Sequence, residues 1–295
     1  MNRVSIEMTQ AFDFDPESME RRVFVVGCSR SGTTLLQSLL AAHPDVATFP
    51  ETRFFWQILA HAPRRRHLIR LGLATGREMQ YLKEMLERFG QDELMTSLPN
   101  QPWTFRRSVE IYLAALDHLA KRQNGRLWVE KTPFHIRYVN TIERFVPSPL
   151  FLHIVRDGRE VVASIVDRAR KHPGFFGGQD EEYGVRLWND CIEKTRTHMK
   201  KENHHVVNYE RIVDETDKKM KSIGNFVGLK YNPEMKKRRV KKHDKFIEPS
   251  ESHKEKVSGP IRKTESKFES LFDNEKKCKI EDCLNLDVFR SIVSS

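Results

Sequence analysis

The clearest pattern in the chain is a run of apolar residues that is followed by small polar residues and then by a helical repeat. Residues 23–26 are all apolar, which is typical of a strand buried on both faces of a parallel sheet. Residues 27–32 form a small loop with two glycines. Beyond it the apolar positions share one side of a helix: Leu35, Leu36, Leu39 and Leu40. The pattern predicts a strand, a tight loop and a helix, which together make an anion cradle.

Four further short apolar runs have the character of strands. They lie at residues 46–49, 127–129, 151–155 and 205–209, and helical patterns separate them. Strands that alternate with helices imply a parallel sheet with helices on both sides. The predicted fold class is therefore α/β, with a P-loop-like parallel sheet of about five strands.

The same pattern predicts how the chain is divided. Residues 1–20 are expected to be a flexible lead-in, residues 21–270 the α/β domain, and residues 271–295 a C-terminal extension. Residues 53–123 read as helices with two breaks. We expect this helical insertion to cover the sheet and to form one wall of an acceptor site.

Composition indicates a soluble globular protein. The chain has 295 residues, of which 38% are hydrophobic and 31% charged, and no apolar run approaches the ~20 residues of a membrane span. The N-terminus has acidic residues and no apolar core of a secretory signal. Four cysteines without a C-x-x-C pair argue against a disulfide framework and a zinc site. We therefore expect no membrane span and a cytoplasmic location.

The net charge of +10 suits an anionic cofactor or acceptor. It would also suit nucleic acid, so a basic nucleic-acid-binding protein is one alternative. That alternative is supported by charge alone, because aromatic residues do not alternate with the basic ones along any face. Nucleic acid is therefore not the expected partner.

The loop after the first strand has the chemistry of a phosphate site. The spacing Gly27-x4-Gly32 followed by two threonines is that of a nucleotide P-loop, but Thr33 stands where a nucleotide triphosphatase has its lysine. Arg30 instead supplies a forked cation, and several hydroxyls surround it. We expect the loop to bind a phosphate-like group. A kinase or nucleotide triphosphatase with a modified loop is the second alternative, and the missing lysine counts against it.

Four polar residues each follow a predicted strand. They are Glu51, Lys131, Arg156 and Tyr209. Ligands of parallel α/β sheets bind beyond the carboxyl ends of the strands. We therefore expect these residues and the glycine loop to share one crevice.

A second anion site is predicted after the fourth strand. Arg156 stands at the strand end, with Ser164 and Arg168 on the helix that follows. We expect this group to hold an anion far from the first one. The alternative is that Arg156 only closes the helix N-terminus by pairing with Asp157.

The chain resembles sulfotransferases that use 3′-phosphoadenosine 5′-phosphosulfate (PAPS), and most of all their tyrosylprotein branch and its bacterial relatives. The resemblance lies in Arg30-Ser-Gly-Thr-Thr-Leu, in residues 42–46 and in Glu51-Thr52-Arg53, and it extends over roughly residues 22–268. It implies PAPS as cofactor and adenosine 3′,5′-bisphosphate (PAP) as its product. The expected transfer is an in-line displacement through a loose transition state.

The resemblance assigns roles residue by residue. It places the 5′-phosphosulfate on Arg30, Ser31, Gly32, Thr33 and Thr34, and the 3′-phosphate on Arg156, Ser164 and Arg168. Lys131, in Glu-Lys-Thr-Pro, would place its charge on the bridging oxygen, and Arg30 would share that task. Tyr209 would contact the cofactor, although a core tyrosine is the alternative. Ser266 and Lys267 match a loop that closes over the cofactor, and Ser266 is also a catalytic candidate.

Glu51 is the predicted general base. A hydroxyl is a poor nucleophile at neutral pH, and a carboxylate at a strand end can accept its proton. The catalytic glutamate of the family falls on this position. The alternatives are that Glu51 only pairs with Arg53, or that His43 is the base rather than a cap of its turn.

A hydroxyl-bearing acceptor, such as a phenol, an alcohol or a carbohydrate, is the expected partner. The chain could also act as a homodimer. No metal is implied, because the sequence offers no cluster of carboxylates.

Overall fold

A parallel five-stranded sheet forms the centre of the protein in a computed structural model, which describes residues 12–60, 63–233, 235–236, 261 and 265–294. The strand order is β2-β3-β1-β4-β5. The bounds are β1 Arg21–Gly27, β2 Val46–Thr48, β3 Leu127–Lys131, β4 Pro149–Val155 and β5 His204–Asn208. The predicted α/β class and the predicted sheet of about five strands are confirmed.

The central strand β1 is buried on both faces, as its apolar run predicts. Val23 and Val25 belong to one core cluster, and Phe24 and Val26 belong to another, because alternate residues of a strand point to opposite faces. The first cluster packs under α2 (Thr33–Ala41) and α13 (Thr216–Val227).

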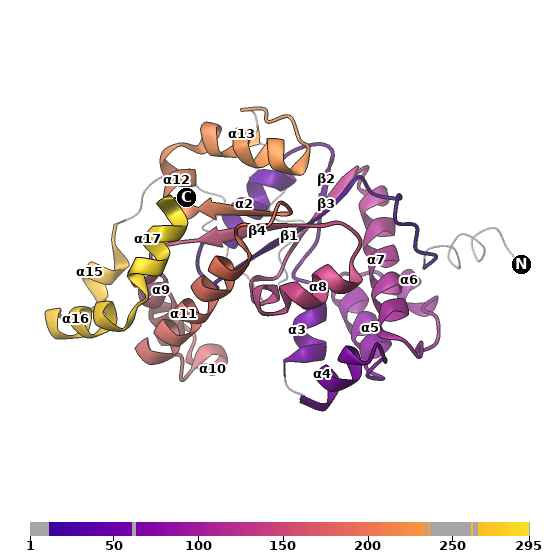
Figure 1. Cartoon of the computed structure of the whole chain (residues 1–295), viewed down its shortest axis with the longest axis horizontal. Coiled ribbons are helices and arrows are strands. Elements are labelled where there is room, and N and C mark those ends of the chain that lie inside the picture. The colour runs from indigo at the N-terminus through magenta and orange to yellow at the C-terminus, as the bar shows by residue number, and fades with distance from the viewer. Residues whose placement is uncertain (1–11, 61–62, 234, 237–260, 262–264, 295) are drawn as a thin grey trace, which may run out of the picture.

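The second face of the sheet carries more helices. They include α7 (Phe105–Arg122), α8 (Val139–Phe145), α9 (Gly158–Lys171) and α11 (Glu181–His198). Figure 1 shows these helices on the side of the sheet that faces away from α2 and α13. The protein is therefore a three-layer sandwich with the sheet in the middle.

The insertion between β2 and β3 is helical, as predicted. Besides α7 it contains α3 (Phe54–Leu59), α4 (Pro63–Arg70), α5 (Glu78–Arg88) and α6 (Asp92–Thr96). The 3-10 helix η1 (Pro133–Tyr138) follows β3, and the short helix α12 (Tyr209–Asp214) follows β5. A third short helix, α10 (Pro173–Phe176), comes after α9. The fifth strand ends one residue earlier than predicted, because Asn208 caps α12 by accepting from the backbone N–H of Arg211.

The described part of the predicted lead-in packs on the core. Phe12 and Met19 are buried, and the Ser18 hydroxyl donates to Asp117 over 2.6 Å. Within residues 12–20, apolar side chains thus reach the second core cluster. Residues 1–11 lie outside the described part.

The C-terminal helices also pack on the domain. They are α15 (Lys267–Leu271), α16 (Asn274–Cys283) and α17 (Leu286–Ser294). Phe289 of α17 lies 5.8 Å from Trp188 of α11 between ring centroids, and Asn189 donates to the carbonyl of Cys283 over 2.8 Å. Among the described residues no helix combines the length and the apolar character that crossing a bilayer requires.

Candidate functional site

Two glycines of the loop between β1 and α2 lie in close contact with neighbouring groups, one with a backbone carbonyl and one with an aromatic ring. Gly27 has φ 147°, and a Cβ there would lie 2.4 Å from the carbonyl oxygen of Ile154. Gly32 has φ 90°, and a Cβ there would lie 2.3 Å from the ring of Tyr209. Both positions therefore require glycine. Gly32 is also the N-cap of α2 and offers no side chain to the amides of Thr33 and Thr34, which remain available for an anion.

Arg30 joins the loop to the helix after β4. Its Nε donates to the Ser164 hydroxyl over 3.1 Å, and its carbonyl oxygen accepts from Arg156 Nη1 over 3.2 Å. Arg30 has φ 72°, so the loop turns through the left-handed region at this residue. The loop and the predicted second anion group thus touch each other.

This contact corrects one expectation. We expected the group Arg156, Ser164 and Arg168 to hold an anion far from the loop. The structure instead packs α9 against the loop, so that both groups form one continuous basic surface. The alternative pairing of Arg156 with Asp157 is also absent, because Asp157 caps α9 and pairs with Arg159 over 2.6 Å.

Positive charge is concentrated on this surface. Burial lowers the pKa of Arg30 to about 10, and repulsion from Arg168 and Arg156 adds to the effect. Burial also lowers the pKa of Arg168. Arg156 Nε, Arg168 Nε and the Ser31 hydroxyl are buried and have no hydrogen-bond partner among the described residues. Leaving buried donors without a partner costs free energy, and a bound anion would accept their hydrogen bonds.

Tyr209 forms the floor of the same surface. Its ring lies against Gly32, and the guanidinium carbon of Arg156 lies 4.4 Å from the ring centroid. This is a cation–π contact, which holds Arg156 over the loop. Tyr209 is partly buried and also packs against the first core cluster, so the alternative of a core tyrosine stays open beside cofactor contact.

Glu51 and Lys131 meet beside the loop. Lys131 Nζ lies 2.6 Å from Glu51 Oε1, and Arg53 Nε lies 3.5 Å from Glu51 Oε2. Lys131 is the last residue of β3, next to β1, and Glu51 follows β2. The alternative pair Glu51–Arg53 therefore exists, but it is longer than the pair that joins the two predicted catalytic residues.

A buried network beneath this pair was missed in the sequence. Glu130 is fully buried and accepts from the hydroxyls of Thr52 (2.9 Å) and Thr132 (2.5 Å), while its other oxygen lies 3.0 Å from His135 Nδ1. Burial by itself raises the pKa of a carboxyl, but these partners outweigh it and hold the pKa of Glu130 below its usual 4.5. The glutamate of Glu-Lys-Thr-Pro was the available signal.

His43 caps its own turn, and Arg168 contacts the segment after α9 in addition to its place beside Arg30. His43 Nδ1 accepts from the backbone N–H of Asp45 over 3.2 Å, which is the capping role that we weighed against catalysis. The Arg168 guanidinium lies 3.9 Å from the Phe176 ring centroid and donates to Gln179 over 2.9 Å.

Ser266 and Lys267 lie on the flank of α9. The Ser266 hydroxyl donates to Glu160 Oε1 over 2.5 Å, and Glu160 Oε2 lies 3.6 Å from Arg156 Nη2. Lys267 pairs with Asp167. These contacts connect Ser266 to the Arg156 side of the surface, and its catalytic role stays a prediction. Residues 260 and 262–264 of the predicted closing loop lie outside the described part.

Solved structures share this fold. The sulfotransferase domain from the curacin biosynthetic pathway aligns with a TM-score of 0.56 at 17% identity, covering 88% of this chain and 95% of that one. Mouse sulfotransferase SULT7A1, solved in complex with PAP, aligns with a TM-score of 0.53 at 13% identity, covering 97% and 92%. At these identities the likeness shows the fold alone.

Sequence comparison finds curated relatives as well. Protein-tyrosine sulfotransferase 1 of Danio rerio is 28% identical over 71% of this chain and 54% of its own length. Protein-tyrosine sulfotransferase 2 of Gallus gallus is 27% identical over 71% and 52%. The chain thus spans about half the length of these curated relatives. The model of the Sulfotransferase family matches residues 22–233, from β1 with its glycine loop to the segment after α13, and the chain therefore belongs to that family.

Proposed function

We propose that the protein transfers a sulfuryl group from PAPS to an acceptor hydroxyl. One observation carries the proposal: Arg30, Arg156 and Arg168 gather on one surface at the carboxyl end of the sheet, where two guanidinium nitrogens and the Ser31 hydroxyl lack partners among the described residues. A ligand with more than one anionic group fits this surface.

The residues present fit the two ends of PAPS. The amides at the start of α2, with Arg30 and Ser31, would hold the 5′-phosphosulfate. Arg156 and Ser164 would hold the 3′-phosphate. The contact between Arg30 and Ser164 supports this assignment, because the two phosphates of one nucleotide are close neighbours. The mouse sulfotransferase of similar fold was solved with PAP, which is the product of such a donor.

Bound PAPS supplies an activated sulfuryl group, and the side chains of this protein do the rest. Glu51 accepts the proton of the acceptor hydroxyl while the oxygen attacks sulfur. The bond from sulfur to the new ester oxygen forms as the bond from sulfur to the phosphate oxygen breaks. Lys131 and Arg30 stabilise the negative charge that develops on the departing phosphate. The distance of 2.6 Å between Lys131 Nζ and Glu51 Oε1 supports these two roles, because the proposed base and the proposed cation are in contact.

A tyrosine phenol is the acceptor that we propose first, because the relatives are named protein-tyrosine sulfotransferases. Arg53, which lies 3.5 Å from Glu51, would favour acidic residues next to that tyrosine. Incubation of the protein with labelled PAPS and three acceptor sets (tyrosine peptides with acidic neighbours, simple phenols and aliphatic alcohols) tests the assignment. Labelling of alcohols without labelling of phenols would contradict it.

Donor identity has its own test, which is a thermal shift. PAP should raise the unfolding temperature, since a ligand at about 100 times its Kd stabilises the folded state by about 2.7 kcal/mol. ATP with magnesium and an oligonucleotide serve as comparisons for the two alternatives that the sequence raised. Stabilisation by ATP with magnesium or by the oligonucleotide, without stabilisation by PAP, would overturn the proposal.

A further inference from the structure

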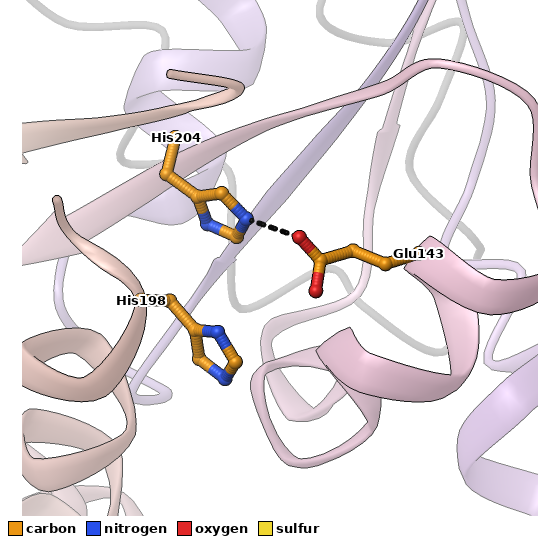
Figure 2. Close-up of side chains that lie close together, drawn as sticks. All are labelled: Glu143, His198 and His204. Atoms are coloured by element: carbon orange, nitrogen blue, oxygen red, sulfur yellow. Dashed lines mark hydrogen bonds and ion pairs between the residues drawn. The ribbon is translucent and has the colours of Figure 1, made fainter. Parts of the chain in front are cut away.

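Three side chains with metal-binding atoms meet at the edge of the sheet that lies opposite the candidate site. Glu143 is in α8, His198 is the last residue of α11, and His204 is the first residue of β5. Their ligand atoms all lie within 4.8 Å of one another. Figure 2 shows the three side chains converging from three separate elements. Tyr209, by contrast, follows the other end of β5.

Hydrogen bonds already join two of the three. His204 Nε2 lies 3.0 Å from Glu143 Oε1, and His204 Nδ1 lies 2.7 Å from His153 Nε2. Glu143 also accepts from Lys201 Nζ over 2.6 Å and from Asn203 Nδ2 over 3.4 Å. The carboxylate and one imidazole are therefore preorganised.

His198 is the member that points to a ligand. It is 4% exposed, and its Nδ1 has no hydrogen-bond partner among the described residues. Figure 2 shows that the ring nitrogen next to the point of attachment is turned toward the Glu143 side of the cluster. The ring stacks on His204, with centroids 5.4 Å apart. A buried nitrogen without a hydrogen-bond partner raises the free energy of the folded protein. A metal ion bound to His198 Nδ1 would give this nitrogen a partner.

We propose that Glu143, His198 and His204 bind one divalent ion of the zinc class. Two imidazoles and one carboxylate are an established zinc ligand set, with water at the fourth position. In a tetrahedral site, two bonds of about 2.1 Å hold their donor atoms about 3.4 Å apart, so donors that lie within 4.8 Å of one another must close around the ion. Glu143 can make this movement because its side chain is 21% exposed. Lys201, which is 43% exposed, can turn to solvent when the ion replaces it.

The neighbouring groups allow the required tautomer. To bind through Nε2, His204 must carry its proton on Nδ1, which then donates to His153 Nε2. His153 in turn carries its proton on Nδ1, 3.4 Å from the Thr195 hydroxyl, which can accept it. All three imidazoles stay neutral through this shift, so no buried charge is created.

The ion would connect α8 and α11 to the edge strand β5, so its binding should stabilise the fold. It lies away from the proposed transfer chemistry, and the proposal does not depend on that function. Stripping metal from the full chain with a chelator, removing the chelator and titrating zinc by calorimetry tests it. One zinc per chain and a higher unfolding temperature are expected. Cobalt in place of zinc should give the visible absorption of a tetrahedral site.

Two variants and a matched control identify the ligands. His198→Asn removes a ligand atom that has no partner among the described residues, and Glu143→Gln keeps the shape of its side chain. Both should weaken zinc binding by more than the roughly 10- to 100-fold that loss of an outer partner costs. His205→Asn should bind zinc normally, because His205 stacks on Phe226 at the other face of β5. Circular dichroism checks that each variant folds. Absence of saturable zinc binding, or unchanged binding in both ligand variants, would overturn the proposal.

Discussion

The two proposed catalytic side chains are already in contact, and this pairing decides how single substitutions should act. Lys131 is buried and Glu51 is mostly buried, with 2.6 Å between Nζ and Oε1. Arg30 and Arg156, which would bind the nucleotide, bond to each other and to α9. Proton removal and nucleotide binding should therefore be separable by mutation.

Glu51→Gln should abolish turnover and leave PAP affinity within a few-fold. The amide cannot accept the proton of the acceptor, and general-base catalysis is typically worth about 10²- to 10⁴-fold. The measurements are the transfer rate with labelled PAPS and PAP binding by calorimetry. Glu87→Gln, at an exposed position of α5, is the control and should behave as the wild type. Equal loss of binding and turnover in Glu51→Gln would show that the role is misassigned.

Arg156→Ala should have the opposite profile. It removes a guanidinium whose Nε lacks a partner among the described residues, and a charge-assisted hydrogen bond is worth about 1.5–3 kcal/mol. PAP affinity should therefore fall at least about tenfold. Arg186→Ala is the control, since Arg186 is exposed and pairs with Glu182 on the outer side of α11. If PAP affinity is unchanged in Arg156→Ala, the assignment of the 3′-phosphate is wrong.

Among the elements, the end of β3 holds the loop after β2 in place. Glu130 accepts from Thr52 of that loop and from Thr132 of its own segment, and Thr132 also accepts from the backbone N–H of Arg53. Glu51 stands directly before Thr52. We infer that Glu130 positions the base without touching the substrate.

Glu130→Gln should destabilise the fold by about 1–3 kcal/mol and lower turnover, with PAP affinity retained. Because the pKa of Glu130 is lower in the folded protein than its usual 4.5, its contribution is present above that pH and is lost as pH falls through the folded value. Denaturant unfolding of both proteins from neutral pH to below pH 4 measures this, and their difference in stability should shrink at the acidic end. A difference that does not vary with pH would contradict the role of the carboxylate charge.

The loop between β1 and α2 offers a second test at this scale. Gly32→Ala places a Cβ against the ring of Tyr209, so it should displace the ring that supports Arg156 and weaken PAP binding. Gly76→Ala is a matched control, because Gly76 has φ 81° but open space around its Cβ position. Both variants carry backbone strain of about 1 kcal/mol or more, whereas only Gly32→Ala should lose PAP affinity. Calorimetry decides the point, and equal affinity in the two variants would show that the close approach is unimportant.

At the scale of the whole molecule, segments far apart in sequence close the second face of the sheet. Arg22 of β1 and Asp117 of α7 form an ion pair of 2.5 Å with side chains 4% and 5% exposed. Asp117 also accepts from Ser18 of the N-terminal segment and from Trp128 of β3. One carboxylate thus joins four parts of the chain.

Asp117→Ala should be strongly destabilising, by about 3–5 kcal/mol, because it leaves the Arg22 charge buried without its carboxylate. The measurement is chemical denaturation at neutral pH. Asp214→Ala, at an exposed position of α12, is the control and should change stability by less than about 0.5 kcal/mol. A loss in Asp117→Ala no larger than that of the control would mean that the pair adds nothing to the fold.

Local patterns by themselves determined the strands, the glycine loop and the residues at the strand ends, because each of these depends on neighbours a few positions away. They also placed Glu51, Lys131, Arg156 and Tyr209 at one edge, since parallel strands end together. Only the tertiary structure decided that Arg30 touches Ser164, that Glu130 supports the loop of Glu51, and that Glu143 meets two histidines. These contacts join residues from different elements, and their distances are set by how the helices pack on the sheet, which no short window of sequence contains.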